Sequence, residues 1–144
     1  MEPPILTFQG PYRFLSNFFI EPDGTNVEAE YQAMKCANPV DAAKFDGMLP
    51  WTAKKFGRSV QMRSDWNAVR KDVMRELVRQ KFEDHEELRA ALIATGDARL
   101  VEGNGWLDAT WGVTRWGLGV GKNWLGEILM EVREELRCSN LSKP

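Results

Sequence analysis

The stretch Val27-Glu-Ala-Glu-Tyr-Gln-Ala-Met-Lys35 decides the fold around it, because it predicts a helix with an unusual face. Ala33, Met34 and Ala37 are expected to pack around that face, which would turn it into the protein. A carboxylate, an amide and an amine that converge in a partly buried place are typical of a reaction site. The alternative is a solvent-facing helix with ordinary surface charges, since Glu and Lys are seldom buried. The functional side chains follow the i, i+3, i+4, i+7 spacing of one helical face: Glu28, Tyr31, Gln32 and Lys35.

Further helices and short strands are predicted on both sides of this segment. Strands are expected over 5–8 and 99–102, and a loop or strand over 14–20. Gly57 is expected to end a short helix as its C-cap. The other predicted helices cover 39–45, 50–56, 86–94 and 123–136, with a long core helix from Ser64 or Asp65 whose apolar positions are Val69, Val73, Leu77, Val78 and Phe82. The sum predicts an α+β, predominantly helical, compact single domain over 1–138 with a few short strands, followed by a tail over 139–144.

Composition narrows the classes of function. The 144 residues, 43% hydrophobic and 28% charged, are typical of one globular domain with a real core. A net charge of −2 gives no general attraction to duplex nucleic acid, so a small or mostly neutral ligand fits better. The sequence has two cysteines, Cys36 and Cys138, and shows neither a signal peptide nor a long apolar run. These features predict a cytoplasmic chain with no disulfide and no membrane span. His85 lies among acids, and no spacing suits a metal, so we expect neither a histidine-based triad nor a bound metal.

A loop rich in glycine and tryptophan precedes the last helix. Four of the six tryptophans fall between Trp106 and Trp124, where their rings either line a pocket for a planar base or pack into the core. Lys122 and the backbone amides near Asn123 are candidates to hold one phosphate, although the Walker pattern fails there. Asp108 and Glu102 are either acids with raised pKa values near aromatic rings or caps of turns.

In their order along the chain, these pieces resemble the NADAR, or YbiA-like, family of N-glycosidases over about residues 8–137. One position departs from the family pattern, because Ala29 stands where the family usually has histidine. The motifs that carry the resemblance are Phe14–Phe18, Glu28–Lys35, Ala53–Arg58, Arg63–Trp66, Lys81-Phe82, Thr95–Glu102, Asp108–Gly112 and Gly121–Arg133.

The resemblance implies a YbiA-like fold and cleavage of an N-glycosidic bond between ribose and a nitrogen base, with no cofactor. The implied substrate is nucleotide-like. It is either a phosphoribosyl-aminopyrimidine intermediate of riboflavin synthesis or ADP-ribosylated guanine in DNA. The alternative is a non-catalytic module that binds ADP-ribose or NAD.

The resemblance also implies roles for individual residues. Glu28 or Asp108 would stabilise an oxocarbenium-like centre or activate water, as paired carboxylates do in glycosidases. Lys35, if desolvated, would attack the open-chain aldehyde of ribose and form a Schiff base. Substrate binding is expected from Ser16, Asn17, Gln32, Arg58, Trp66, Glu102, Trp111, Gly112, Lys122 and Asn123.

Overall fold

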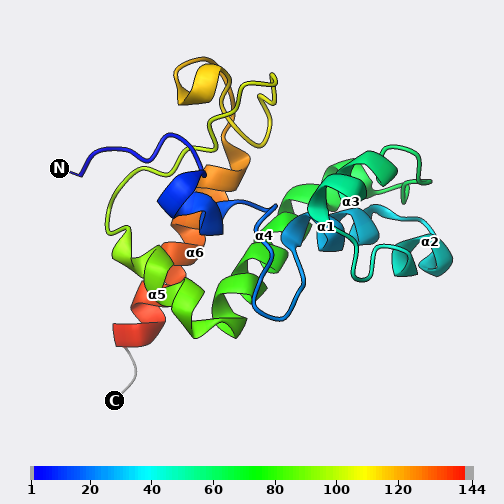
Figure 1. The fold of residues 1–144 in the computed structure, drawn as a ribbon, viewed down its shortest axis with the longest axis horizontal. Helices are drawn as coiled ribbons and strands as arrows, with labels where there is room; N and C mark the ends of the chain where they lie inside the picture. The colour runs from blue at the N-terminus through cyan, green and yellow to red at the C-terminus, as the bar shows by residue number, and fades with distance from the viewer. Residues whose placement is uncertain (1, 142–144) are drawn as a thin grey trace. The chain divides into compact units, whose positions relative to one another are not determined.

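The computed structural model describes residues 2–141 and divides the chain into two compact units (Figure 1). One unit is continuous and comprises residues 17–77. The other is discontinuous, because it joins the residues up to Ser16 with those from Val78 onward. The boundary falls inside one long helix, α4 (Trp66–Asp84). The expected single domain over 1–138 stays a prediction.

The continuous unit is built around α1 (Val27–Lys35), α2 (Pro39–Ala43) and α3 (Pro50–Phe56). Each of the first two helices begins at an asparagine whose side chain accepts a backbone N–H: Asn26 from Ala29 at 2.8 Å and Asn38 from Asp41 at 2.8 Å. Helix α1 packs against both α2 and α3. Ala29, Phe45 and Ala53 are fully or almost fully buried between them and form the core of this unit.

The discontinuous unit contains η1 (Gly10–Leu15), the end of α4, α5 (Glu86–Ala94), η2 (Arg115–Gly117) and α6 (Trp124–Leu141). Helix α5 packs against α6. Two isolated parallel bridges, Ile5 with Leu100 and Gly103 with Val113, join its extended segments. The largest buried apolar side chains of this core are Phe82, Leu15, Leu92, Leu100, Ile128, Leu129, Val78 and Val132.

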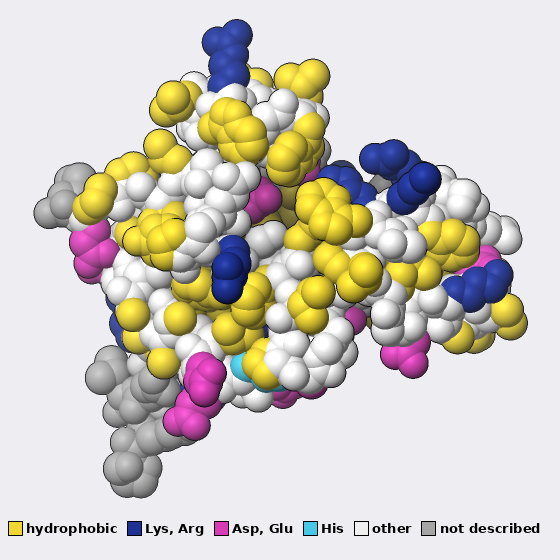
Figure 2. Space-filling model, in the orientation of Figure 1, with side chains coloured by type: hydrophobic (Ala, Val, Ile, Leu, Met, Phe, Trp, Pro, Cys, Tyr) yellow, Lys and Arg dark blue, Asp and Glu magenta, His cyan; other side chains and the backbone are white. Residues whose placement is uncertain are grey.

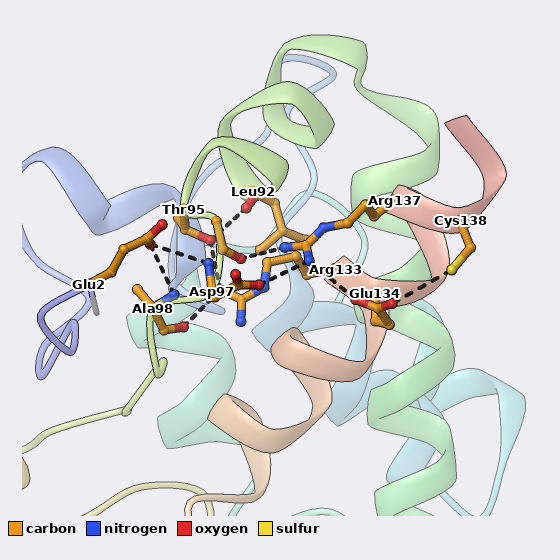
Figure 3. Close-up of polar contacts among 10 residues, drawn as sticks. Glu2, Leu92, Thr95, Asp97, Ala98, Arg133, Glu134, Arg137 and Cys138 are labelled. Carbon is orange, nitrogen blue, oxygen red and sulfur yellow. Dashed lines mark hydrogen bonds and ion pairs between the residues drawn. The ribbon is translucent and has the colours of Figure 1, made fainter. Parts of the chain in front are cut away.

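Two arginines of α6 fix the turn that follows α5 (Figure 3). The guanidinium of Arg133 is buried, and its Nη1 donates to Thr95 Oγ1 at 2.9 Å and to the Ala98 carbonyl at 2.8 Å. Arg137 pairs with the Asp97 carboxylate at 3.0 Å. From the other side, the Glu2 carboxylate accepts the Asp97 and Ala98 amides. The turn is therefore held from two directions, and it fixes the start of the glycine-tryptophan loop.

The predominantly helical α+β prediction is confirmed, and every predicted helix is present. The predicted strands over 5–8 and 99–102 meet only at the single bridge between Ile5 and Leu100. The segment expected as loop or strand over 14–20 begins inside the 3₁₀ helix η1. Helix α6 continues to Leu141, three residues into the expected tail, and 142–144 lie outside the described residues. Among the described helices, none combines the length and apolar character required to cross a bilayer.

The buried face of α4 agrees with the predicted one only in part. Val78 and Phe82 are buried as predicted, whereas Val69, Val73 and Leu77 are only half-buried. Met74 and Lys81 complete the buried stripe. The spacing of apolar residues could not reveal this stripe, because one of its members is a lysine.

Candidate functional site

The polar stripe of α1 points into its unit. Glu28, Tyr31 and Gln32 are buried, and Lys35 is half-buried. Of the two alternatives left open by the sequence, the inward-facing stripe is therefore correct. The expected packing residues are partly wrong, since Met34 and Ala37 are exposed and only Ala33 is partly buried.

Within this stripe the amide of Gln32 orients the carboxylate of Glu28. Gln32 Nε2 donates to Glu28 Oε1 at 3.0 Å, one helical turn away. The other end of the amide, Gln32 Oε1, is buried and accepts no hydrogen bond from the described residues. A buried acceptor without a donor is costly, so this oxygen is available to a hydroxyl or N–H group that reaches it.

Gly57, the residue after α3, lies against both Gln32 and Lys35. Its carbonyl accepts a hydrogen bond from Lys35 Nζ. A Cβ placed on Gly57 would lie 2.1 Å from Gln32 Oε1, well inside van der Waals contact. The expected C-cap is present, but its φ of −61° is right-handed, so the left-handed conformation that usually selects glycine there is absent. Glycine is needed at this position for space.

Burial is the main influence on the pKa of Lys35. It lowers the pKa of the Lys35 ammonium, while the negative charges of Cys36 and Glu28 act in the opposite direction. Burial also raises the pKa of the Cys36 thiol, so less of that thiol is present as the nucleophilic thiolate. More of Lys35 is present as free amine than in an ordinary lysine, and the free amine is the form that acts as a nucleophile.

Three other expected residues surround this stripe in the same unit. The backbone carbonyl of Asn17 accepts a hydrogen bond from the Glu28 amide at 3.1 Å. The side-chain Nδ2 of Asn17 donates to Met74 Sδ at 3.5 Å. Trp66 is buried at the start of α4, with its ring centroid 4.9 Å from that of Tyr31, so it is a core residue there. Arg58 is exposed immediately after Gly57.

Ser16 belongs to the other unit, where a buried lysine holds it. Lys81 Nζ donates to the Phe14 carbonyl at 2.6 Å and to the Ser16 carbonyl at 3.1 Å. Lys81 is 3% exposed, and sequence reasoning gave it no role beyond its place in a motif. No signal in the spacing of apolar residues marks it, because a lysine is normally exposed.

Asp108 acts as the cap of a turn in the loop over 103–122. Its Oδ1 accepts the amides of Thr110 at 3.1 Å and Trp111 at 3.0 Å. Asn104, almost fully buried, accepts the Trp106 and Asp108 amides through its own Oδ1. This geometry matches the turn-capping alternative for Asp108, and a catalytic role for it stays a prediction.

The backbone amides at the start of α6 are not open to an anion, so they do not favour the predicted phosphate site, and the role of Lys122 in it stays a prediction. These amides already have acceptors in the preceding loop: Lys122 donates to Ala109, Asn123 to Gly112, Trp124 to Thr110 and Leu125 to Trp111. The side chain of Asn123 is also engaged, since it accepts the Glu102 amide and donates to the Leu100 carbonyl. Helix N-termini attract anions only through amides that have no other acceptor. Asn123 is therefore a structural residue.

Comparison with known proteins assigns the family. The NADAR domain matches residues 9–137. The chain belongs to the NADAR domain family.

Three relatives show which members of the family this NADAR chain is similar to. N-glycosidase YbiA of Escherichia coli is 49% identical over 89 residues, which are 60% of this chain and 54% of YbiA. Its NMR structure covers 100% of this chain and 91% of that one, with a TM-score of 0.84 and 38% identity. N-glycosidase Npun_R5314 of Nostoc punctiforme is 39% identical over 141 residues, 88% and 87% of the two chains. Riboflavin biosynthesis protein VVA0006 of Vibrio vulnificus is 38% identical over 156 residues, 95% of this chain and 40% of that protein.

The matched part thus spans about half of the YbiA sequence, with 54% covered. In this NADAR chain the structure gathers Glu28, Gln32 and Lys35 around Gly57. It places the remaining expected residues of the C-terminal half in the loop over 103–122 or at its edges. There Trp111 is half-buried with its ring 5.4 Å from Trp124, Gly112 is buried against the Glu102 carbonyl, and Lys122 is exposed with Nζ 5.3 Å from the Trp124 ring.

Proposed function

We propose that this NADAR chain hydrolyses the N-glycosidic bond between a ribose and a nitrogen base. The observation that carries the proposal is the buried carboxylate of Glu28, oriented by Gln32 and followed on the same face by the half-buried amine of Lys35. A fixed carboxylate can accept a proton from an attacking water, and a partly desolvated amine can act as a nucleophile. Two relatives that carry the name N-glycosidase support it.

In the direct route, the bond between the ribose C1′ and the base nitrogen breaks, and the base leaves with the electron pair and takes up a proton. Water adds to the oxocarbenium-like C1′, and Glu28 accepts the proton that the water loses. The products are the free sugar and the free base. Water is the only co-reactant that this balance requires.

In the covalent route, the ribose ring of the substrate opens, so that C1′ is joined to the base nitrogen as an imine, and the neutral amine of Lys35 attacks C1′. The bond between C1′ and the base nitrogen then breaks, the base leaves as a free amine with a proton taken from the Lys35 nitrogen, and a Schiff base between Lys35 and C1′ remains. Water adds to this Schiff base and releases the sugar aldehyde and the Lys35 amine. The lowered pKa of Lys35 favours this route, because only the neutral amine carries the lone pair that attacks. The carboxylate of Glu28 would transfer protons in these steps.

We propose a phosphoribosyl-aminopyrimidine as the first substrate to test, since one relative is named a riboflavin biosynthesis protein. ADP-ribosylated guanine in DNA contains the same kind of ribosyl-nitrogen bond and is the second. Both carry a planar base and at least one phosphate. The exposed Arg58 is the proposed phosphate contact, and Asn17 and Gln32 are the proposed contacts to sugar hydroxyls.

The alternative of a binding module without turnover rests on Ala29, which occupies the usual position of a family histidine. In the structure Ala29 is buried in the core with Phe45 and Ala53. Its side chain belongs to a different face of α1 from Glu28, Gln32 and Lys35, which follow one another at helical spacing. The change at position 29 therefore leaves the polar stripe intact, and this favours an active enzyme.

The test is to incubate the chain with each substrate and to detect the released base by chromatography. Release of aminopyrimidine or of guanine that is faster than in buffer alone, and that is lost in Glu28→Gln, is the expected result. Tight binding of both substrates without release of either base would establish the binding module instead.

A further inference from the structure

Trp106 and Trp116 form an exposed aromatic corner in the loop between α5 and α6. Their ring centroids are 5.9 Å apart and their planes stand at 83°. Trp106 is 55% exposed and Trp116 46%, which is unusual for side chains of this size. Figure 2 shows hydrophobic side chains gathered at the surface over this loop, at the top of the view. By contrast, Trp111 in the same loop packs edge-on against Trp124 and is half-buried.

One buried residue holds both members of the corner. Asn104 is 1% exposed, its Oδ1 accepts the Trp106 amide at 3.2 Å, and its backbone carbonyl accepts the Trp116 amide at 2.9 Å. Gly105 leaves room for the second ring, since a Cβ there would lie 2.8 Å from Trp116 Cζ2. The two rings are therefore placed by specific contacts, although they remain open to solvent.

The backbone of this loop carries strain at the corner. Arg115 and Trp116 are consecutive residues in the left-handed region, with φ of 50° and 52°, and Leu107 has φ of 67°. A residue other than glycine in this left-handed conformation costs on the order of 1–3 kcal/mol of folding free energy. Strain of this kind persists where surrounding contacts enforce it, and it is concentrated at ligand clamps and active sites.

The charges that the loop presents outward are positive. Arg115 and Lys122 are exposed, whereas Oδ1 of the loop's carboxylate, Asp108, is bonded to two backbone amides. Two perpendicular aromatic rings contact one planar ligand by stacking on its face and meeting its edge. Basic side chains on the same surface add attraction for phosphate, as on proteins that bind single-stranded nucleic acids.

We infer that the Trp106–Trp116 corner binds the heteroaromatic base of a phosphorylated nucleotide ligand, and that Asn104 positions both rings. The inference rests on the proposed function in one respect, namely that the substrate contains such a base. It moves the base contact within the loop from Trp111, which the sequence favoured, to the two exposed tryptophans.

The experiment measures binding by calorimetry, with ADP-ribose and AMP as probes that carry a base and ribose 5-phosphate as the probe without one. Trp106→Ala and Trp116→Ala should each weaken ADP-ribose and AMP binding roughly 5- to 100-fold and leave ribose 5-phosphate binding unchanged. Trp116→Phe should retain most of the affinity, because it keeps a stacking face. Trp51→Ala, at an exposed tryptophan of the other unit, is the matched control and should bind every probe as wild type does.

Binding of AMP and ADP-ribose at wild-type strength in both alanine variants would overturn the inference. An equal loss of all three probes would also overturn it, as would a wild-type chain that prefers neither base-bearing probe to ribose 5-phosphate. If an alanine variant is unfolded by circular dichroism, Trp106→Leu and Trp116→Leu replace it with the same criteria. A chain that cleaves nothing but shows base-dependent binding through the corner would support this inference and refute the proposed function.

Discussion

Gln32 and Glu28 are joined by a hydrogen bond of 3.0 Å from an amide nitrogen to a carboxylate oxygen, in a part of α1 that solvent hardly reaches. The amide carries no charge, so its hydrogen bond orients the carboxylate and leaves the negative charge of the carboxylate in place. A negative charge held in a fixed position is suited to stabilise a developing cation such as an oxocarbenium ion.

Glu28→Gln is expected to lower the rate of base release by about 10²–10⁴-fold, because it keeps the shape and removes the negative charge. Substrate affinity should change little. Glu30→Gln on the same helix is the control, since Glu30 lies outside the polar stripe. Single-turnover assays measure the rate and calorimetry the affinity, and a Glu28→Gln chain that turns over normally would remove Glu28 from the mechanism.

Lys35→Arg separates the covalent route from the direct one. Arginine keeps the positive charge but cannot form an imine, so the covalent route predicts a loss of about 10²-fold or more in rate. Wild type treated with substrate and borohydride should gain the mass of the sugar fragment on Lys35, detected by peptide mass spectrometry. Substantial activity in Lys35→Arg without any adduct would establish water as the nucleophile.

The pH dependence gives a second measure of Lys35. Since burial lowers its pKa, the active neutral amine should appear as pH rises, at a pH below the ordinary value for lysine. The rate is expected to increase with pH through that lowered pKa and then to level off. The unfolded chain binds more protons there, so the free energy of unfolding should rise over the same interval. A rate profile that is flat from neutral pH to the ordinary lysine pKa would contradict a nucleophilic Lys35.

Gly57→Ala should damage the site while the fold persists. The new Cβ would lie 2.1 Å from Gln32 Oε1, so the amide must move and release Glu28. A displacement of this size can cost roughly 10²-fold in rate. In a chain that already carries Gln32→Ala the same change should cost much less, because the clash is gone. Equal effects in the two backgrounds, measured as a double-mutant cycle, would show that Gly57 acts in another way.

Two substitutions of Asp108 distinguish a role as turn cap from a catalytic role. Asparagine retains the side-chain oxygen that accepts the Thr110 and Trp111 amides, whereas alanine removes it. If Asp108 is a turn cap, Asp108→Asn should keep near-wild-type turnover and Asp108→Ala should lower stability by about 1 kcal/mol. A loss of 10²-fold or more in Asp108→Asn, with an unchanged melting temperature, would restore its catalytic role.

The helices and the grouping of Glu28, Gln32 and Lys35 could be read from the sequence, because both depend on local spacing. Their burial could not, since Glu and Lys are normally exposed and the elements that enclose them, such as α3 and Gly57, are distant in sequence. The role of Gly57 was equally hidden. Its contact with Gln32 joins residues 25 positions apart, and nothing local distinguishes it from a common helix C-cap.

The loop over 103–122 was harder to predict, because more of its contacts join residues that are distant in the sequence. In the sequence, the start of α6 resembles an anion site. In the structure, its backbone amides donate hydrogen bonds to the carbonyls of residues 109–112. Those contacts depend on the path of the loop, which is set by Asn104 and by close approaches at its glycines. Composition identified the loop as aromatic, but it could not show which tryptophans face outward.

The division of the chain has a consequence for its synthesis on the ribosome. Residues 17–77 are contiguous, so this part can acquire its core while the rest is still being translated. The segment up to Ser16 is translated before this part, yet its partners, the bridge at Leu100 and the turn held by Arg133, are translated after it. At about 5–20 residues per second, Ile5 waits roughly 6–25 seconds for the codons of α6 to be read. During that interval the segment up to Ser16 lacks its native partners, while residues 17–77 already have theirs.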